Sequence, residues 1–414
     1  MSILLNSLVA ALFCVRGAHA VGTAFGYATG TTGGGSAAAA VPTSTSQLVS
    51  WLGDSTARTI LLDKIFDFTS TENNWCDNYY PSATKSTVTY YQAGINAITV
   101  GSNKTLLGKG SAGGIKGKGL RIAGGSNIII QNIRISDLNA QYVWGGDAIT
   151  IDGGSNIWID HNYVVGIQIK NIGRQMIVTG YGAAKGVTIS DNVFEGSGLT
   201  ESLNLYPPLR QQAPLVMVGI IVIESFKREL NTPLGRHYWA LYFTGATDTI
   251  TFARNYVYMT SGRGPKVGGT SGYTQSIHMY NNYYVSVEGH ALDAGTGASV
   301  IMEGNYFNVV TTPSVSGTAG YVYAAIDSST ASTCSSYLGR TCYTNKLWGA
   351  LLQYSMLGTN IARLTRLSSG SLSRTDTAAL STLSSASVVK SASIMSADSV
   401  GSYVQSNAGL GIVN

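Results

Sequence analysis

The sequence predicts an all-β protein, a right-handed single-stranded parallel β-helix whose sides are covered by loops and short helices. The first observation is a short repeated motif, here called the phrase: two apolar residues separated by one position, followed by an asparagine three residues after the second. The second is its spacing, because the asparagines follow one another at intervals of 30, 30, 63, 27 and 23 residues. A recurrent period in that range is typical of a solenoid. The third is a composition of 50 glycines and 11% charged residues, which suits a β protein rich in turns. The phrase ends at Asn162, Asn192, Asn255, Asn282 and Asn305, with a looser copy around Ile129 and Asn132.

Each phrase alternates with period 2, as a β-strand does. In the copy at 157–162, Ile157 and Ile159 are expected to point inward, while Trp158 and Asp160 point outward. One coil alone cannot bury its apolar face, whereas stacked coils can. Asparagines aligned at one corner of the stack can hydrogen-bond along it and satisfy backbone groups that water does not reach. The long, flat outer faces of such a solenoid suit an extended polymer.

The chain begins with a predicted signal peptide, residues 1–20. Residues 4–15 are an apolar run too short to span a bilayer, and Ala18-His19-Ala20 has the pattern of a cleavage site. No later segment is both apolar and long enough to span a membrane. We therefore expect a secreted, extracellular protein without a membrane partner. In a secreted chain, Asn103-Lys104-Thr105 becomes a usable N-glycosylation sequon.

The mature chain, 21–414, is expected to be one elongated domain. Residues 21–125 carry a Gly/Ala/Thr-rich start, a short helix at 46–53 and the first strands, at 59–62 and 97–100. Residues 126–310 form the repeat core, and 311–414 are Ser/Thr/Ala-rich and expected to cap and wrap the solenoid. The formal charge of +5 forms no long basic run, so nucleic acid is not expected as a partner. We expect a monomer.

The segment 198–235 interrupts the repeats. It holds four of the eight prolines and an apolar run at 215–223 that does not alternate. The interval of 63 residues is either two coils or one coil plus an insertion, and removal of these 38 residues leaves 25. We interpret the segment as translated intron or a gene-model error that adds nothing to the core, with a strand at 238–243 between the neighbouring coils. An ordinary long surface loop is the alternative. Residues 354–370 are a possible second insertion.

The cysteines form an odd set once Cys14 leaves with the signal peptide. Cys334 and Cys342 enclose seven residues and are expected to close a surface loop by a disulfide. Cys76 is then unpaired, as a free thiol, an intermolecular bridge, or the remnant of a lost pair.

Several motifs, taken together and in order, resemble those of the fungal pectin lyases, members of the pectate lyase superfamily. They are Trp144-Gly-Gly-Asp147-Ala-Ile149, Trp158-Ile-Asp160-His161, His237-Tyr-Trp239, Thr260-Ser-Gly-Arg263-Gly-Pro265-Lys266 and the stretch from Cys334 to Cys342. The resemblance implies a β-helix enzyme that cleaves methyl-esterified polygalacturonate (pectin) by β-elimination, without cofactor or metal. Pectate lyases carry Arg-x-Pro-x-x-Arg and a carboxylate cluster that binds Ca²⁺. Here Gly268 follows Arg263 by five positions, and Lys266 occupies the third.

The resemblance assigns the base that removes the C5 proton to Arg263. Because arginine is effectively always protonated, Arg263 either takes the proton itself or organises another group, with Lys266 and Asp160 as candidates. Negative charge develops on the uronate carbonyl in the transition state, and fixed donors stabilise it. Asp160 matches a calcium-binding position of pectate lyases. The family's further arginine falls at Gly186, so Lys185 is the candidate substitute.

Three tryptophans, Trp158, Trp239 and Trp75, are expected to line an aromatic cleft for sugar rings. Each residue also has a structural interpretation. Arg263 can be a turn arginine, Asp160 and His161 can close a coil, the tryptophans can cover the barrel, and Asp147 is expected to be structural.

Other function classes also stay open. A calcium-dependent pectate lyase is one, and a β-helix hydrolase is another, although the paired carboxylates that it requires do not accompany the motifs. A carbohydrate-binding homologue disabled by the insertion is the non-catalytic alternative.

Overall fold

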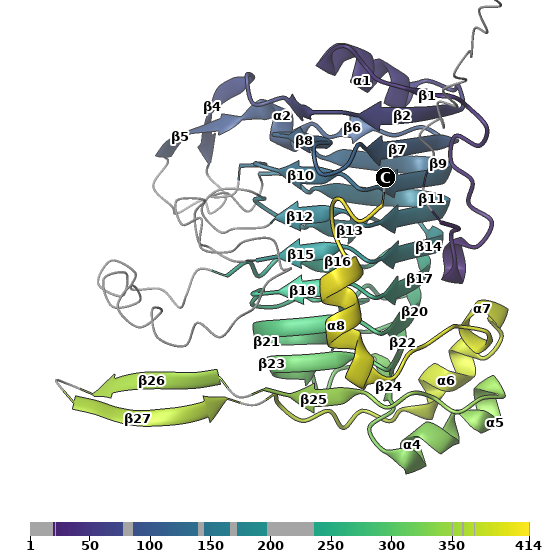
Figure 1. Ribbon diagram of the computed structural model, residues 1–414, viewed down its shortest axis with the longest axis vertical. Coiled ribbons are helices and arrows are strands. Elements are labelled where there is room, and N and C mark those ends of the chain that lie inside the picture. Colours follow the sequence, from purple (N-terminus) through teal and green to yellow (C-terminus); the bar gives the residue numbers. More distant parts are fainter. Residues whose placement is uncertain are drawn as a thin grey trace, which may run out of the picture.

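The computed structural model describes residues 20, 22–77, 86–139, 145–165, 172–196, 236–349, 351–357, 360–367 and 369–413. Most of its strands belong to one 23-stranded sheet in which every pairing joins parallel strands of successive coils. The strands lie one above another along the long axis of the molecule (Figure 1). The parallel β-helix predicted from the repeats is therefore confirmed.

Each coil contributes strands to three faces. The first face consists of β6 (Ile98–Thr99), the start of β9 (Leu120–Gln131) and of β11 (Ile149–Asp160), β13 (Ile177–Thr179), β16 (Leu241–Phe243), β19 (Lys266–Val267) and the end of β21 (Tyr283–Ala294). The second face consists of β1 (Ala39–Ala40), β2 (Arg58–Leu62), β7 (Lys104–Gly108), the ends of β9 and β11, β14 (Ala184–Ser190), β17 (Thr247–Ala253), β20 (Thr274–Tyr280), β22 (Ala298–Glu303) and β24 (Tyr321–Ala324). The third face consists of β3 (Ile65–Asp67), β8 (Gly114–Lys116), β10 (Arg134–Ser136), β12 (Tyr163–Val165), β15 (Val193–Glu195), β18 (Tyr256–Tyr258), the start of β21, β23 (Tyr306–Ser314) and β25 (Lys346–Trp348).

Short helices cover the solenoid. The helix expected at 46–53 is α1 (Thr45–Gly53), which begins where the Ser44 side chain accepts a hydrogen bond from the Gln47 backbone N–H. The others are η1 (Gly26–Ala28), α2 (Gln92–Ile95), α4 (Ser328–Thr333), α5 (Ser335–Leu338), α6 (Thr377–Leu383), α7 (Ser387–Lys390) and α8 (Ala397–Asn407). Helix α1 lies at the amino-terminal end of the stack, α4 to α7 lie at the opposite end, and α8 lies along its side (Figure 1). The carboxy-terminal region thus caps and wraps the solenoid as expected.

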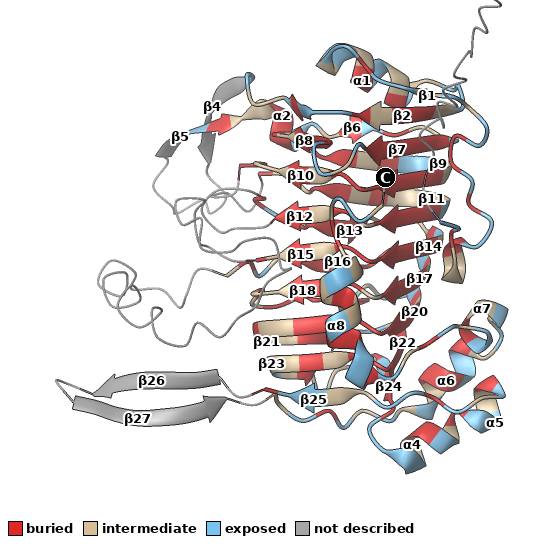
Figure 2. Ribbon diagram, viewed as in Figure 1, coloured by how far each residue is buried: buried red, intermediate tan, exposed pale blue. Residues whose placement is uncertain are grey.

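Inward-facing apolar residues build one continuous core. Ile157 and Ile159 are fully buried in it, as the alternation predicted. Parallel register places equivalent residues directly above one another, so each coil buries its apolar face against the next. Buried residues run the length of the stacked strands (Figure 2). The apolar column that contains Ile157 consists of Ile128, Ile157, Val187, Ile250, Ile277, Val300 and Val322.

An asparagine ladder occupies the corner between the second and third faces. The backbone N–H of Asn162 donates to Oδ1 of Asn192 at 2.9 Å, and that of Asn192 to Oδ1 of Asn255 at 3.1 Å. Each side-chain amide also donates to the next asparagine and to a strand carbonyl, as Asn192 Nδ2 does to the Ile159 carbonyl at 3.0 Å. The expected bonding along the stack is confirmed. The ladder consists of Asn162, Asn192, Asn255, Asn282, Asn305 and Asn345.

Two details of the ladder differ from the prediction. Asn132 is not a member, because Ile133 occupies the ladder position and donates its backbone N–H to Oδ1 of Asn162. Asn132 instead adopts a left-handed conformation with φ 59°, equivalent to His161 one coil further on, with φ 53°. Asn345, which has no apolar pair before it, is the further member.

The interval of 63 residues is one coil plus an inserted segment. Asn192 and Asn255 are consecutive in the ladder, and β14 pairs directly with β17. Between them β16 pairs with β13 and β19, where a strand was expected. The proposed insertion at 198–235, including the run at 215–223, lies outside the described residues. The described residues on its two sides meet, because the His237 N–H donates to the Gly196 carbonyl at 3.0 Å.

Two antiparallel pairs lie outside the large sheet. One joins β4 (Glu72–Asp77) and β5 (Ser86–Tyr91), and the other joins β26 (Leu351–Leu357) and β27 (Asn360–Leu367). The β26–β27 pair accounts for most of the suspected second insertion at 354–370 and extends away from the stack (Figure 1).

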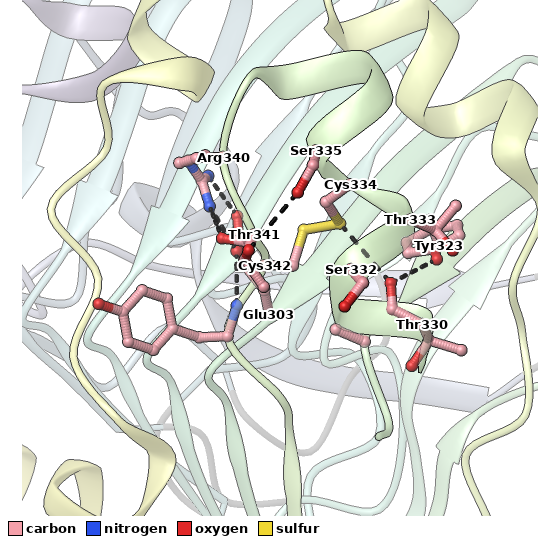
Figure 3. The surroundings of a disulfide bond; sticks show 12 residues. Glu303, Tyr323, Thr330, Ser332, Thr333, Cys334, Ser335, Arg340, Thr341 and Cys342 are labelled. Carbon is pink, nitrogen blue, oxygen red and sulfur yellow. Dashed lines mark hydrogen bonds and ion pairs between the residues drawn. A yellow bond between two sulfur atoms is a disulfide. The ribbon is translucent and has the colours of Figure 1, made fainter. Parts of the chain in front are cut away.

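The disulfide between Cys334 and Cys342 is present as expected. The disulfide closes the loop that carries Arg340. The Arg340 Nη2 lies 2.6 Å from Oε1 of Glu303, whose side chain is fully buried (Figure 3). Cys76 lies in β4 opposite Thr87. The predicted signal peptide lies outside the described residues except for Ala20. Among the described helices, none is long and apolar enough to cross a membrane.

Candidate active site

The corner between the third and first faces brings turns from successive coils together. Backbone hydrogen bonds stack these turns, from Ala148 N–H to the Gln175 carbonyl at 2.9 Å, from Met176 N–H to the Ala240 carbonyl at 2.8 Å and from Leu241 N–H to the Arg263 carbonyl at 2.7 Å. Asp147, Arg174, Trp239 and Arg263 therefore come from four consecutive coils, although 116 positions (263 minus 147) separate the first from the last.

Arg263 lies at the centre of an aromatic cluster. Its guanidinium carbon is 4.0 Å from the ring centroid of Trp239, 5.0 Å from that of Tyr242 and 5.7 Å from that of Tyr238. Such contacts fix the plane of the cation and exclude water from one side of it. Burial lowers the pKa of Arg263; Tyr238 and Tyr242 oppose that shift, and Arg174 adds to it. Arg263 and Trp239, both predicted as site residues, are therefore in contact.

Lys266 begins β19 on the outward side of the first face. Its register partners are Tyr242 on one side and Asp293 on the other, so these three side chains form a column. Lys266 Nζ lies 3.3 Å from an Asp293 carboxylate oxygen, with both side chains partly exposed at 31% and 19%. The ammonium group therefore remains accessible to a ligand on this face.

Arg174 and Asp147 complete the charged surface of the corner. The Arg174 Nε lies 3.8 Å from Oδ1 of Asp147, and the Arg174 side chain is 51% exposed. The Gln175 N–H donates to the same carboxylate at 2.8 Å. Burial raises the pKa of Asp147, while Arg174 opposes the shift. Sequence reasoning missed Arg174, whose only signal was its place three residues before the first-face strand β13, one residue before Gln175, which lies level with Asp147 of the preceding coil.

His237 supports this corner from inside. Its Nε2 lies 2.7 Å from the Arg174 carbonyl and 3.1 Å from the Trp239 carbonyl. Because both partners are acceptors, Nε2 carries the proton and donates. Burial lowers the pKa of His237 to about 4, so the ring is neutral at ordinary pH. The residue ties the turn of Arg174 to the turn of Trp239.

Asp160, predicted as a catalytic candidate, does not join this cluster. It ends the second-face part of β11, beside the asparagine ladder, and is only 1% exposed. Its carboxylate accepts hydrogen bonds from Gln131 Nε2 at 2.8 Å and Ser190 Oγ at 2.6 Å, and lies 2.6 Å from His161 Nδ1. These partners satisfy the carboxylate inside the protein, which is the structural interpretation of the motif.

Trp158 points out of the core but is covered. It is 4% exposed, packs with Ala24 and Ala28 of the amino-terminal segment, and donates its Nε1–H to Ser190 Oγ at 2.9 Å. It is therefore not available for stacking on a sugar, and that prediction is wrong. The physical reason is that a segment distant in sequence occupies the face to which Trp158 points.

The remaining predicted site residues lie apart from Arg263. Lys185 is exposed in β14, opposite Ser155, at the corner between the first and second faces. Trp75 lies in β4, opposite Val88. Asn103 is exposed, and its side-chain oxygen accepts a hydrogen bond from Asn127 at 2.8 Å.

One group of potential metal ligands occurs among the described residues, made of Asp160, His161 and Asp191. Arg254 already provides a cation there, since its guanidinium donates to Asp191 at 2.7–3.1 Å. At the corner of Arg263, by contrast, Asp147 and Asp293 are separated and each lies beside its own cation. Three cations at one corner of the solenoid, next to aromatic rings, suit recognition of an anionic or carbonyl-rich sugar polymer.

Comparison with known proteins places this geometry in a family. A family model described as pectate lyase matches residues 1–201. The chain is 42% identical to pectin lyase B of Emericella nidulans over 363 residues, covering 82% of this chain and 86% of that protein. It is 43% identical to a probable pectin lyase A of Aspergillus fumigatus over 367 residues, which cover 82% of this chain and 87% of the relative.

The chain belongs to the pectin lyase family. It also matches a probable pectin lyase F of Aspergillus niger, at 38% identity over 94% of this chain and 75% of that protein. The pectin lyase fold is similar to that of solved pectate lyases. A Bacillus subtilis pectate lyase variant shares it with a TM-score of 0.56 and 18% identity, over 96% of this chain and all of the other. A pectate lyase bound to a hexasaccharide gives a TM-score of 0.56 at 17% identity.

Proposed function

We propose that this protein is a secreted, monomeric pectin lyase that cleaves methyl-esterified polygalacturonate by β-elimination and leaves a C4–C5 double bond at the new non-reducing end. The observation that carries the proposal is the position of Arg263 at the corner between the third and first faces, in contact with Trp239 and Tyr242 and near the partly exposed cations Lys266 and Arg174. The curated relatives named as pectin lyases support the substrate class.

β-Elimination requires three chemical steps at this corner. The C5 proton must be removed, negative charge on the adjacent carbonyl must be stabilised, and the C4–O bond must break as the leaving oxygen gains a proton. Arg263 is the essential group for the first of these steps, and burial lowers the pKa of its guanidinium. Lys266 and Arg174 are the cations placed to stabilise the developing charge. Trp239 and Tyr242 present rings on which sugar faces can stack.

The charge pattern favours an ester over a free uronate. A neutral methyl ester has a more acidic C5 proton than a uronate anion, so fixed cations are sufficient for its elimination. In a calcium-dependent site we expect several carboxylates to converge on one ion. Asp147 and Asp293 instead pair with separate cations, Arg174 and Lys266.

The test measures the ultraviolet absorbance of the unsaturated product, with highly methylated pectin and de-esterified polygalacturonate compared in the presence and absence of a chelator. We expect activity on methylated pectin that the chelator does not change. Dependence on Ca²⁺, or preference for the de-esterified polymer, contradicts the proposal in favour of a pectate lyase. A folded protein without activity on either polymer favours a carbohydrate-binding homologue.

A further inference from the structure

A histidine one coil beyond Arg263 contacts the backbone of that residue. The Arg263 N–H donates to Nε2 of His290 at 3.1 Å. A backbone N–H is always the donor, so Nε2 must be the unprotonated nitrogen of a neutral ring. The contact therefore exists in only one protonation state of His290.

The backbone at this point needs an external acceptor. Arg263 has φ 47°, a left-handed conformation that few non-glycine residues adopt without support. On either side of it, the ordinary ladder runs from Glu288 N–H to the Thr260 carbonyl at 3.0 Å and from Asp293 N–H to the Pro265 carbonyl, also at 3.0 Å. A register shift lies between Val287 and His290 in the same strand, β21. The side chain of His290 takes the place of a backbone carbonyl at this irregular step.

The ring of His290 is held in place by tight packing. A Cβ added at Gly262 would lie 3.2 Å from the His290 ring and 2.6 Å from Tyr238, and one added at Gly289 would lie 1.8 Å from the Ser261 carbonyl. The Tyr238 ring packs edge-on against His290, with centroids 5.9 Å apart, and Tyr238 is itself one of the rings around Arg263. The histidine thus contacts both the backbone of Arg263 and part of its aromatic surroundings.

We propose that His290 is a positioning residue for the β-elimination, whose neutral Nε2 holds the Arg263 turn in the conformation that presents the guanidinium to the substrate. The inference rests on the proposed function of the Arg263 corner. Protonation of His290 replaces the acceptor with a donor facing the Arg263 N–H, so the turn loses its support as the pH falls.

Burial and the charges around His290 act on its pKa in different directions. Tyr238, Arg263, Lys266 and Asp293 are the titratable groups that face it. Burial lowers the pKa of His290 from 6.5, Asp293 opposes that shift, and Lys266 and Arg263 add to it. The ring thus stays neutral to a lower pH than an ordinary histidine, and the acid limb of the activity profile should reflect its protonation.

The experiment compares wild type, His290→Gln and His290→Phe for kcat and KM on highly methylated pectin across a series of pH values. Glutamine places an amide oxygen where Nε2 lies and does not titrate, whereas phenylalanine fills the space without an acceptor. We expect His290→Gln to keep kcat within about threefold of wild type at the pH optimum, because one net hydrogen bond is retained, and to move the acid limb to lower pH. His290→Phe should lower kcat about tenfold with little change in KM, since the turn loses one hydrogen bond.

Two outcomes overturn the inference. One is an acid limb of His290→Gln that coincides with the wild-type limb, and the other is a wild-type kcat in a folded His290→Phe. Thermal melting shows whether His290→Phe is folded. If it is not, the position of the acid limb in His290→Gln is by itself the test of the inference. An inactive wild type contradicts the proposed function, whereas an active wild type with an unchanged limb in His290→Gln contradicts only the role of His290.

Discussion

Two corners of the same solenoid carry charged residues, and they use them in opposite ways. At the corner between the second and third faces, turns of uniform length stack an unbroken asparagine ladder, and Asp160, Asp191 and Arg254 are paired within it. At the corner between the third and first faces, turns of unequal length leave Arg174 and Lys266 partly exposed. The uniform turns pair these groups inside the protein and build the scaffold. Unequal turns leave charges that can meet a ligand.

Substituting the arginine at each corner tests most directly whether one corner serves catalysis and the other serves stability. Arg263→Ala should lower kcat about a thousandfold, because a group acting in the transition state is lost, and leave the melting temperature close to that of wild type. Arg254→Ala is the matched control. It leaves the carboxylate of Asp191, 1% exposed, without its cation, so it should cost about 4 kcal/mol of unfolding free energy while the folded fraction keeps its turnover. Equal loss of stability in both variants would mean that Arg263 is a turn arginine.

The ladder corner is tested by Asn255→Ala. Its Oδ1 accepts hydrogen bonds from the backbone N–H and the side-chain amide of Asn192, and its Nδ2 donates to the Ile189 carbonyl at 2.9 Å. Removing the side chain therefore leaves buried groups without these partners. We expect a loss of about 3 kcal/mol in urea unfolding. Asn407→Ala, which removes one bond to the Tyr403 carbonyl within α8, should change stability by about 0.5 kcal/mol or less. Similar losses in the two variants would contradict the special role of the ladder.

His237 gives a prediction for the pH dependence of the active corner. Its folded-state pKa of about 4 lies below the unfolded value of 6.5, so the unfolded chain binds more protons between these values. This contribution to stability is complete above pH 6.5 and is lost as the pH falls towards 4, by about 3 kcal/mol in all. His237→Gln keeps a donor for the two carbonyls but does not titrate. The wild-type minus variant difference in unfolding free energy should therefore rise with pH through this window, and a constant difference would contradict the assignment.

The sequence predicted the scaffold better than the site. Paired apolar residues before an asparagine recur because every coil must bury an apolar face against its neighbours and bond its corner along the stack. The fold and the order of the coils therefore follow from these repeats. Spacing alone could not separate the ladder position from the left-handed position before it, and Asn132 was misplaced by one residue for that reason. Asn345 lacks the apolar pair that marked the others.

The site was predicted only where its residues stand close together in sequence or share a specific motif. Arg263 and Lys266 belong to one motif, and Trp239 to a second one nearby. Arg174 carries no motif of its own, and its relation to Asp147 appears only when the coils stack. Asp160 and Trp158 were misassigned because an outward-facing residue in a strand looks the same whether solvent or another segment covers it. The cover over Trp158 comes from residues more than 100 positions away, which local alternation does not reveal.

The hydrogen bond from the His237 N–H to the Gly196 carbonyl bears on how the sequence between these two residues can vary. Gly196 and His237 are neighbours on the solenoid although 40 residues lie between them in sequence, and His237 is two positions from Trp239, one of the aromatic contacts of Arg263. Closing a loop of twice the length costs only about 0.6 kcal/mol more, so this point tolerates exchange of one segment for another of different length and composition. The coils on either side keep their register whichever segment is carried. The junction between Gly196 and His237 is therefore a natural graft point, where new contacts to a polymer can be added beside the reacting groups while the ladder corner stays unchanged.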